Sequence, residues 1–376
     1  MRHLITAAAF LCAVAASHVA GATTPPPPPE PVVERNPDLC SSEIPGACLD
    51  GVGGGVTSLD SLRVNRSGLG SRAAATSEER AQQQARGVAP GLVSGMSASA
   101  GSVGAWTLWG SGSLASYEGE VAIAPYEADT YNILLGADRF FGDRLVAGFT
   151  LGYENTDTET RFNGGGQDRD GLQVGLYAAY LIDDVFSIDA AVGYAALDTD
   201  ENRIDTGAIR VGAVATPGAT IRGSYDADRA FATVNLNAVK TFGNWVLGGR
   251  VGALHAVESQ DRYTETGGAG ARSIGKRHLD LTQAYASVDL GYAAGAFEPY
   301  VSLGYRNDLG RDDGNSAGGL PAGIRTTPSD DDDWQGGLGV RYFGGSGVSG
   351  SLEWLRTFGR DKFDEDVVTA TVRVPF

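Results

Sequence analysis

The sequence predicts an all-β fold: a closed, 12-stranded antiparallel transmembrane β-barrel with an N-terminal helix in or near the lumen. Three observations predict it. From about residue 103 to 376, apolar residues alternate with small or polar ones, as in strands with one apolar face. Tight turns alternate with longer connections. After the first twenty-odd residues, no apolar run approaches the roughly 18–20 residues that a membrane helix needs.

The composition excludes several classes of protein. The 376 residues include 29 Lys+Arg and 46 Asp+Glu, a net charge of −17, and 42% are hydrophobic. This hydrophobic content is enough for a folded body and argues against wholesale disorder. The acidic balance and the lack of a Lys/Arg block make nucleic acid a poor partner.

The first 22 residues have the pattern of a secretory signal peptide. Arg2 and His3 form a short basic start, Leu4 to Ala16 is apolar, and Ala20-Gly21-Ala22 supplies an A-x-A cleavage pattern. The apolar run is too short for a stop-transfer helix. We therefore expect export of the remaining chain.

A Pro/Gly-rich segment, residues 23–75, follows the signal peptide. Its proline run is expected to be extended and stiff, and its Gly/Ser/Ala-rich part cannot bury a core. The segment holds Cys40 and Cys48, with Pro45-Gly46 between them. Export through an oxidising compartment and this turn favour a disulfide loop between the two cysteines.

Residues 76–90 predict one helix. Thr76 and Glu79 form a capping box, and Gly87 and Pro90 end the helical pattern. Its apolar stripe is thin and made of small side chains. The segment is therefore either a solvent-exposed linker or a slender polar helix inside the barrel.

The region 103–376 is expected to contain twelve strands. We place them at about 103–117, 126–141, 144–156, 168–182, 185–198, 226–242, 245–258, 276–292, 296–308, 331–343, 348–358 and 364–376. Five turns of two to four residues alternate with connections that are mostly longer. The long connections are expected at 157–167, 199–225, 259–275 and 309–330. This sorting of loops is typical of outer-membrane barrels of Gram-negative bacteria.

Aromatic residues near the strand ends predict the two girdles at the membrane interfaces. They are Trp109, Tyr117, Tyr126, Tyr131, Phe140, Phe141, Tyr153, Tyr180, Trp245, Tyr292, Tyr305, Trp334, Phe343, Trp354 and Phe376. Because lipid offers no hydrogen-bond partner to an open sheet edge, the first and last strands are expected to pair.

If the apolar faces point outward, a set of charged and amide side chains points into the lumen. These are Asp138, Asp189, Asn235, Asn237, Arg250, Asp289, Glu298, Arg306, Arg341, Glu353 and Arg373. A helix is about 10–12 Å across, and twelve strands enclose more space than the eight-strand barrel that side chains alone fill. We expect these residues to contact the helix 76–90, although the alternatives of a simple plug or a helix outside the barrel stay open.

An outer-membrane hydrolase is a first alternative function. Glu258, Asp261 and Asp280 lie near His255 and His278 in the sequence, so a histidine and an acid could together act as a general base, but G-x-S-x-G is absent. We therefore expect no enzymatic activity, no catalytic residue, no cofactor and no metal.

A porin or adhesin acting through its long loops is the alternative. The acidic run Asp330 to Asp333 would then bind calcium or bridge lipopolysaccharide through divalent ions. The same run also fits a hydrated strand start that discourages edge pairing.

Several motifs resemble the translocation barrel of autotransporters (type V secretion). Trp106 to Gly112 resembles the first strand of that family, and 126–140 resembles the second, with Gly136 and Asp138 as its Gly-x-Asp. Later strands match at Gly148–Tyr153, Val174–Tyr180, Ser187–Tyr194 and Gly339–Tyr342. The terminal Phe376, preceded by Val374 and Val372, resembles the C-terminal assembly signal.

The resemblance implies an outer-membrane β-domain that inserts and translocates or displays its own N-terminal segment at the cell surface. It implies contacts with outer-membrane lipid, lipopolysaccharide and periplasmic chaperones, and with the barrel-assembly machinery through Phe376. In two ways the chain departs from the family: residues 23–75 are short for a passenger, and Pro375 occupies the penultimate position. No Asn-Asn pair lies near the helix, so we expect the segment to stay attached.

Overall fold

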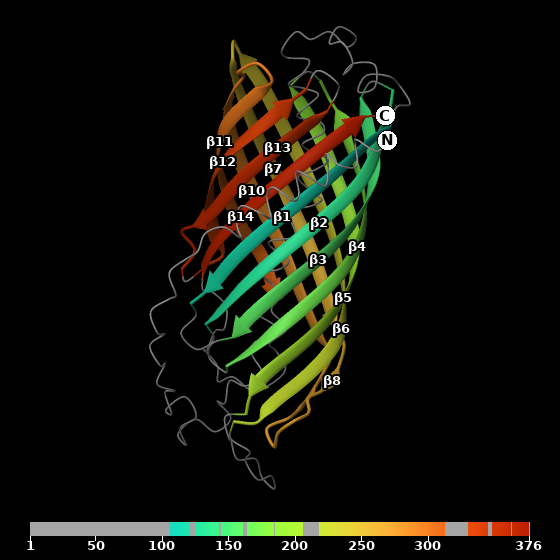
Figure 1. Cartoon of the computed structure of the whole chain (residues 1–376). Helices are drawn as coiled ribbons and strands as arrows, with labels where there is room; N and C mark the ends of the chain where they lie inside the picture. Colours follow the sequence, from blue (N-terminus) through green and yellow to red (C-terminus); the bar gives the residue numbers. More distant parts are fainter. Residues whose placement is uncertain are drawn as a thin grey trace. The chain divides into compact units, whose positions relative to one another are not determined.

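Twelve strands close into one antiparallel barrel in the computed structural model (Figure 1). It describes residues 106–375, apart from 121–124, 143, 161–163, 184, 206–217, 313–329, 345–347 and 362. The barrel strands are β1 (Trp106–Gly119), β2 (Tyr126–Phe141), β3 (Leu145–Thr160), β4 (Gly165–Leu181), β5 (Phe186–Ile204), β6 (Thr220–Phe242), β7 (Trp245–Gln260), β10 (Arg277–Tyr292), β11 (Phe297–Asp312), β12 (Asp332–Phe343), β13 (Ser349–Phe358) and β14 (Phe363–Pro375). The predicted fold class is confirmed.

Each strand pairs with its neighbours in the chain, and β14 closes the ring on β1. The closing register pairs Thr107 with Pro375 and Gly119 with Phe363. Within the described residues, no helix has the length and apolar character to cross a membrane.

The connections differ between the two ends of the barrel. At one end, 142–144, 182–185, 243–244, 293–296 and 344–348 join consecutive strands by tight turns. Gly243 shows why these turns are tight: its φ of 63° lies in the left-handed region that glycine adopts at little cost. Because the number of strands is even, β1 begins and β14 ends at this same end of the barrel.

At the opposite end, strands β3 to β6 are longer than their sequence indicates. The expected loop 157–167 is reduced to 161–164, and the expected loop 199–225 to 205–219. The strands continue because their backbone ladders go on pairing: Thr160 faces Gly165, and Ile204 faces Thr220. Both faces of these extensions carry polar residues, so no apolar alternation marks them in the sequence.

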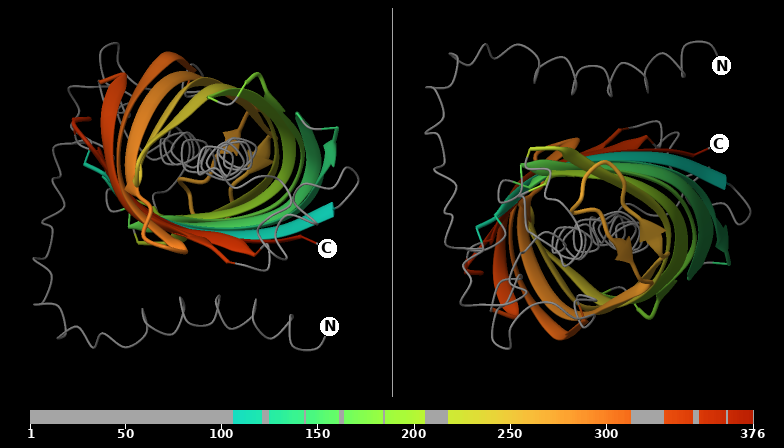
Figure 2. Two further views of the ribbon diagram at one scale, coloured as in Figure 1. Left: turned by 90° about the horizontal axis from the view of Figure 1, so that it is seen from above. Right: turned by 90° about the horizontal axis from the view of Figure 1, so that it is seen from below.

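The connection 261–276 contains a small hairpin, β8 (Tyr263–Thr264) with β9 (Ser273–Ile274). Both end-on views in Figure 2 place this hairpin within the outline of the barrel. The Tyr263 ring stacks on Tyr225 of β6 with centroids 4.8 Å apart. Arg203 of β5 binds Glu265 at 2.8 Å. The hairpin is therefore held against the inner wall at the end opposite the tight turns.

The outward face of the strands is apolar. Leu172, Val174 and Leu176 on β4, for example, alternate with buried side chains. Interfacial aromatics on this face include Trp245 with Tyr292, and Tyr305 with Trp334, each pair with ring centroids 5.1 Å apart. An apolar belt with aromatic side chains near its edges is the surface that a lipid bilayer requires.

Four aromatics expected in the girdles are buried on the inner face instead. Trp109, Tyr117, Tyr126 and Phe140 are buried, so their placement in the girdles was wrong. Each lies at a strand position whose parity points into the barrel. Gly136 explains one case, since a Cβ there would lie 2.4 Å from the Trp109 ring. The space above this glycine is filled by the inward indole.

Several predictions lie outside the described residues. They are the signal peptide 1–22, the segment 23–75 with Cys40 and Cys48, the helix 76–90, and Phe376.

Candidate functional site: the lumen wall

The inner wall of the barrel is polar and carries most of the buried charge. The eleven side chains assigned to the lumen lie on inward positions of their strands. Asp138, Asp189, Asn235, Asn237, Glu298, Arg306 and Arg373 are buried, and Arg250, Asp289, Arg341 and Glu353 are half-buried. The structure brings them into four clusters, each joining several strands.

The first cluster lies at the seam between the chain's first and last strands. Arg373 of β14 reaches over β1 to Asp138 of β2, with Nη2 at 3.0 and 2.8 Å from the two carboxylate oxygens. The Tyr177 hydroxyl of β4 donates to Asp138 at 2.7 Å, and Trp109 Nε1 of β1 donates to that hydroxyl at 2.6 Å. We call these four residues the seam cluster.

A second cluster surrounds Asp189 on β5. Its two carboxylate oxygens accept from Asn235 at 2.7 Å and from Asn237 at 2.6 Å. Asn237 accepts in turn from Arg250 Nε at 2.9 Å, and Asn235 accepts from the Tyr285 hydroxyl at 2.5 Å. The cluster joins β5, β6, β7 and β10.

The third cluster centres on Arg341 of β12. Its guanidinium binds Asp289 at 3.1 Å and Glu298 at 2.9 Å. It also lies over the Tyr300 ring, 3.9 Å from the centroid, in cation–π geometry. The Tyr300 hydroxyl is hydrogen-bonded to Glu353 of β13. Four of the sequence-assigned side chains therefore meet at this point.

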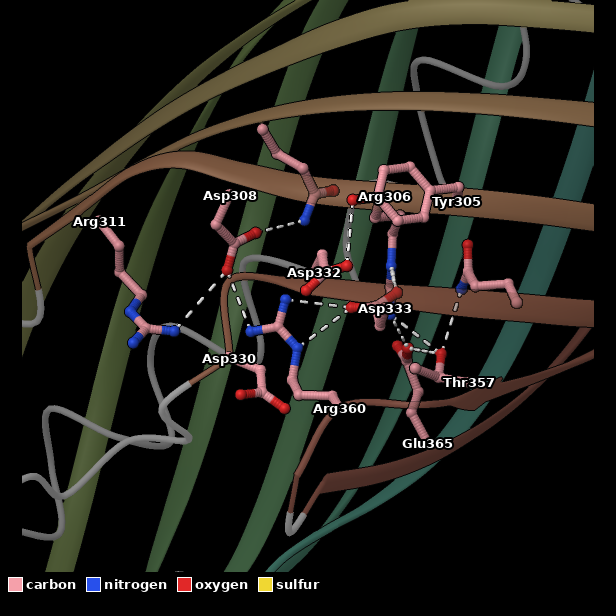
Figure 3. Close-up of polar contacts among 12 residues, drawn as sticks. Tyr305, Arg306, Asp308, Arg311, Asp330, Asp332, Asp333, Thr357, Arg360 and Glu365 are labelled. Atoms are coloured by element: carbon pink, nitrogen blue, oxygen red, sulfur yellow. Dashed lines mark hydrogen bonds and ion pairs between the residues drawn. The ribbon is translucent and has the colours of Figure 1, made fainter.

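The fourth cluster, at the ends of β11 to β14 opposite the tight turns, contains two arginines (Figure 3). Arg306 binds Asp333 at 2.5 Å and Glu365 at 2.9 Å. Arg360 binds the other oxygen of Asp333 and also Asp308, both at 3.1 Å. We call these five residues the rim cluster; only Arg306 among them was assigned to the lumen from the sequence.

A fifth cluster was missed altogether by the sequence reasoning. Arg169 and Arg229 share Glu258, and Arg229 also binds Glu154. All four positions lie within expected strands, so the alternation itself could have located them. They were passed over because polar residues occupy both faces near these strand ends.

One histidine–acid pair weighed for a hydrolase, His255 and Glu258, does not come together. Glu258 points inward, whereas His255, three residues earlier on β7, points outward. His255 Nδ1 lies 2.9 Å from the Thr282 hydroxyl. Since residues three apart on a strand point to opposite faces, this histidine and this carboxylate cannot cooperate.

The acidic run at 330–333 is also divided between faces and partners. Asp332 points outward and accepts from the Tyr305 hydroxyl at 3.0 Å. Asp333 points inward to the rim cluster, and Asp330 accepts from the Asp361 backbone N–H at 3.0 Å. Among the described residues, no group of three or more potential metal ligands converges.

Comparisons with known proteins agree with this architecture. The structure is similar to the translocator domain of the autotransporter NalP from Neisseria meningitidis, with a TM-score of 0.59 and 14% identity over 80% of this chain and 97% of that one. It is also similar to the β-domain of the Bordetella autotransporter BrkA, with a TM-score of 0.58 and 19% identity over 72% and 100%.

A third similar structure is the transport unit of AIDA-I from Escherichia coli, with a TM-score of 0.50 and 12% identity over 73% and 91% of the two chains. No curated protein sequence matches this chain. At these identities, the structural similarities establish the fold alone. The sequence profile of the autotransporter β-domain family, however, matches residues 108–354. The chain belongs to the autotransporter β-domain family and is an outer-membrane β-barrel translocator of Gram-negative bacteria.

Proposed function

We propose that this barrel carries its own N-terminal segment, residues 23–75, to the cell surface and keeps it attached. The topology is the observation that supports this most directly. The chain enters β1 at the end with the tight turns, and β14 closes the wall. A segment that begins at this end can reach the other face only through the enclosed lumen.

The length of the chain is sufficient for this path. As a helix, the fifteen residues 76–90 span about 22 Å at 1.5 Å per residue. The fifteen residues 91–105 add up to about 50 Å when extended. Together they exceed the roughly 30 Å hydrocarbon core. The Cys40–Cys48 disulfide loop would then lie outside the barrel.

The polar wall suits a polar helix in the lumen. We propose that the residues of the second and third clusters, Asp138 and Arg373 of the seam cluster, and Arg306 form the surface against which 76–90 lies. The helix carries Glu78, Glu79, Arg80 and Arg86, and the wall offers both signs of charge.

The outside of the barrel supports the proposed partners. Val372 and Val374 of β14 lie on the outward face, while Arg373 between them points inward. We propose that these valines and Phe376 are read by the barrel-assembly machinery after delivery by periplasmic chaperones. Lipopolysaccharide would contact the outward side chains beyond the apolar belt. We propose no catalytic role for any residue.

An epitope tag tests the proposed display. The tag is placed after Ala22, intact cells are treated with protease, and loss of the tag is followed by immunoblotting. We expect cleavage of this tag, as of a matched tag in the connection 313–331. A third tag in the turn 344–348 is expected to stay protected. Protection of the Ala22 tag until the outer membrane is permeabilised would contradict surface display.

Conductance separates this function from the porin alternative. In planar bilayers, the purified mature chain is expected to conduct weakly, and deletion of 76–90 is expected to raise the conductance. A large, steady conductance in the intact chain would favour a porin. A barrel-free N-terminal fragment in the culture medium would contradict the proposed attachment.

A further inference from the structure

Glu258 lies at the centre of a buried network that crosses the inside of the barrel. Its carboxylate accepts from Arg169 Nη1 at 3.1 and 3.3 Å, from Arg229 Nε and Nη2 at 3.1 and 3.0 Å, and from Gln260 at 2.9 Å. Its side chain is fully buried, and the two guanidiniums are nearly so. One carboxylate therefore binds two cations that come from β4 and β6.

The network is electrically neutral. Arg229 Nη1 also binds Glu154 of β3 at 2.7 Å, so two arginines meet two glutamates. Arg169 additionally donates to Thr199 at 3.1 Å and to Tyr225 at 3.2 Å. Its contact with Glu258 passes over the inner face of β5 and β6, so the network faces the interior of the barrel. Without Glu258, the same site would carry a net charge of +1.

The segment proposed to pass through this lumen, residues 23–75, has a net charge of 4 − 6 = −2, and its acids all lie in its N-terminal part. Residues 23–60 contain six acids against one Arg, a net charge of 1 − 6 = −5. The acids are Glu30, Glu34, Asp38, Glu43, Asp50 and Asp60. A net positive charge in a confined site of low dielectric would attract these carboxylates. Such an attraction would hold the segment inside the barrel.

We infer that Glu258 determines which segments the lumen lets through: it neutralises Arg169 and Arg229, so that an acidic segment passes without being bound. This inference rests on the proposed passage of 23–75 through the lumen. It agrees with the pairing at other inward arginines. Arg306 and Arg341, for instance, each bind two carboxylates.

The test combines a wall variant with two versions of the segment. Glu258→Gln removes the negative charge but keeps the size of the side chain. The second segment version replaces the six acids by their amides. After a pulse of synthesis, surface appearance of the tag after Ala22 is timed by protease treatment of intact cells. Glu258→Gln is expected to slow the native segment about two- to fivefold, the upper part of the range that one ion pair with a mobile carboxylate would give, and to leave the amide version unchanged.

Two controls separate charge from folding. Glu159→Gln removes an outward, exposed carboxylate from β3 and is expected to change neither rate. Glu258→Gln with Arg229→Gln leaves Arg169 opposite Glu154, restores neutrality and is expected to restore passage of the native segment. Equal slowing of both segments by Glu258→Gln would show a structural role only, and no slowing at all would also overturn the inference.

A mirror variant covers the case in which Glu258→Gln does not fold. Arg169→Gln leaves two glutamates with one arginine, so the wall becomes negative. It is expected to slow a segment whose six acids are replaced by lysine and to leave the native segment unaffected. An effect in the opposite sense would overturn the inference. If the unaltered barrel never exposes either segment, it is the proposed display that has failed.

Discussion

The seam cluster and the rim cluster both hold buried ion pairs in the barrel wall, but they differ in how far apart in the sequence the paired residues lie. The seam cluster joins Asp138 to Arg373 across 235 residues of chain. The rim cluster joins strands that follow one another, with separations of 27 to 59 residues. Arg306 and Arg360 can meet their partners once β11 to β14 have paired, whereas Arg373 reaches Asp138 only after β14 has paired with β1.

The two clusters also differ in redundancy. Asp333 of the rim cluster binds two arginines, whereas Asp138 of the seam cluster binds Arg373. Removing one arginine therefore leaves Asp333 with a cation but leaves Asp138 buried beside neutral partners. The comparison teaches that the seam is the more fragile of the two, because the charge of Asp138 on β2 is compensated by one arginine, Arg373, which reaches it from β14 across the closing strand pair.

The largest effect is expected for Arg373→Met. It leaves the Asp138 carboxylate buried without a cation, which typically costs about 3–5 kcal/mol. The free energy of unfolding in detergent micelles, together with the heat-dependent gel mobility of the closed barrel, measures this loss. Adding Asp138→Asn removes the uncompensated charge and is expected to recover part of it. Native stability in Arg373→Met would refute the dependence of closure on this pair.

Gly136→Ala tests the packing within the seam cluster. The new Cβ would lie 2.4 Å from two atoms of the buried Trp109 ring, and overpacking of this kind costs roughly 1–3 kcal/mol. Gly112→Ala is the matched control, because its nearest neighbour is 4.0 Å away. Equal unfolding midpoints for the two variants would contradict this expectation. They would mean that the Trp109 ring can move away from the new Cβ despite its hydrogen bond to Tyr177.

Arg360→Met tests the redundancy of the rim cluster. Asp333 keeps Arg306, and Asp308 keeps Arg311 at 3.7 Å and Gln283 at 2.7 Å. The loss is therefore expected to be about 1–2 kcal/mol, the range of a few hydrogen-bonding contacts. Measured beside Arg373→Met under the same conditions, it should be the milder of the two. The reverse order would break the comparison.

The smallest effect is expected at Asp183, an exposed carboxylate in the tight turn between β4 and β5. Its Oδ1 accepts from the backbone N–H groups of Val185 and Phe186, both at 2.8 Å, and these bonds lower the pKa of Asp183. Because the pKa is lower in the folded state, the stabilisation is present above the unfolded pKa of about 3.9 and is lost as pH falls through the folded pKa.

Unfolding midpoints of the native chain and Asp183→Asn, measured between about pH 5 and pH 2, check this turn. The small gap between the two proteins is expected to close towards the acidic end. A gap that stays constant over the whole range would mean that the carboxylate charge plays no part in stabilising the turn. The stability difference between the native chain and Asp183→Asn also shows how much an exposed carboxylate contributes, for comparison with the buried carboxylate of Asp138.

Much of the wall could be predicted from the sequence, and the failures have physical causes. Period-two alternation located the twelve strands and assigned Asp138, Asp189 and Arg306 to the inner face. It failed for the extensions of β3 to β6, because water imposes no apolar pattern on strands beyond the lipid. It also misplaced Trp109, since an aromatic side chain near a strand end suits either a lipid interface or a space above an inward glycine.

The sequence by itself determined the all-β class, the number of strands and the face on which most side chains lie. Export of the chain stays a prediction from the sequence. Only the tertiary structure decided which inward charges meet. Alternation states on which face a side chain lies, but the partners of Arg373, Arg169 and Arg306 depend on strand register, on the curvature of the wall and on closure. These are properties of the assembled barrel, because each of them brings together residues that are far apart in the sequence.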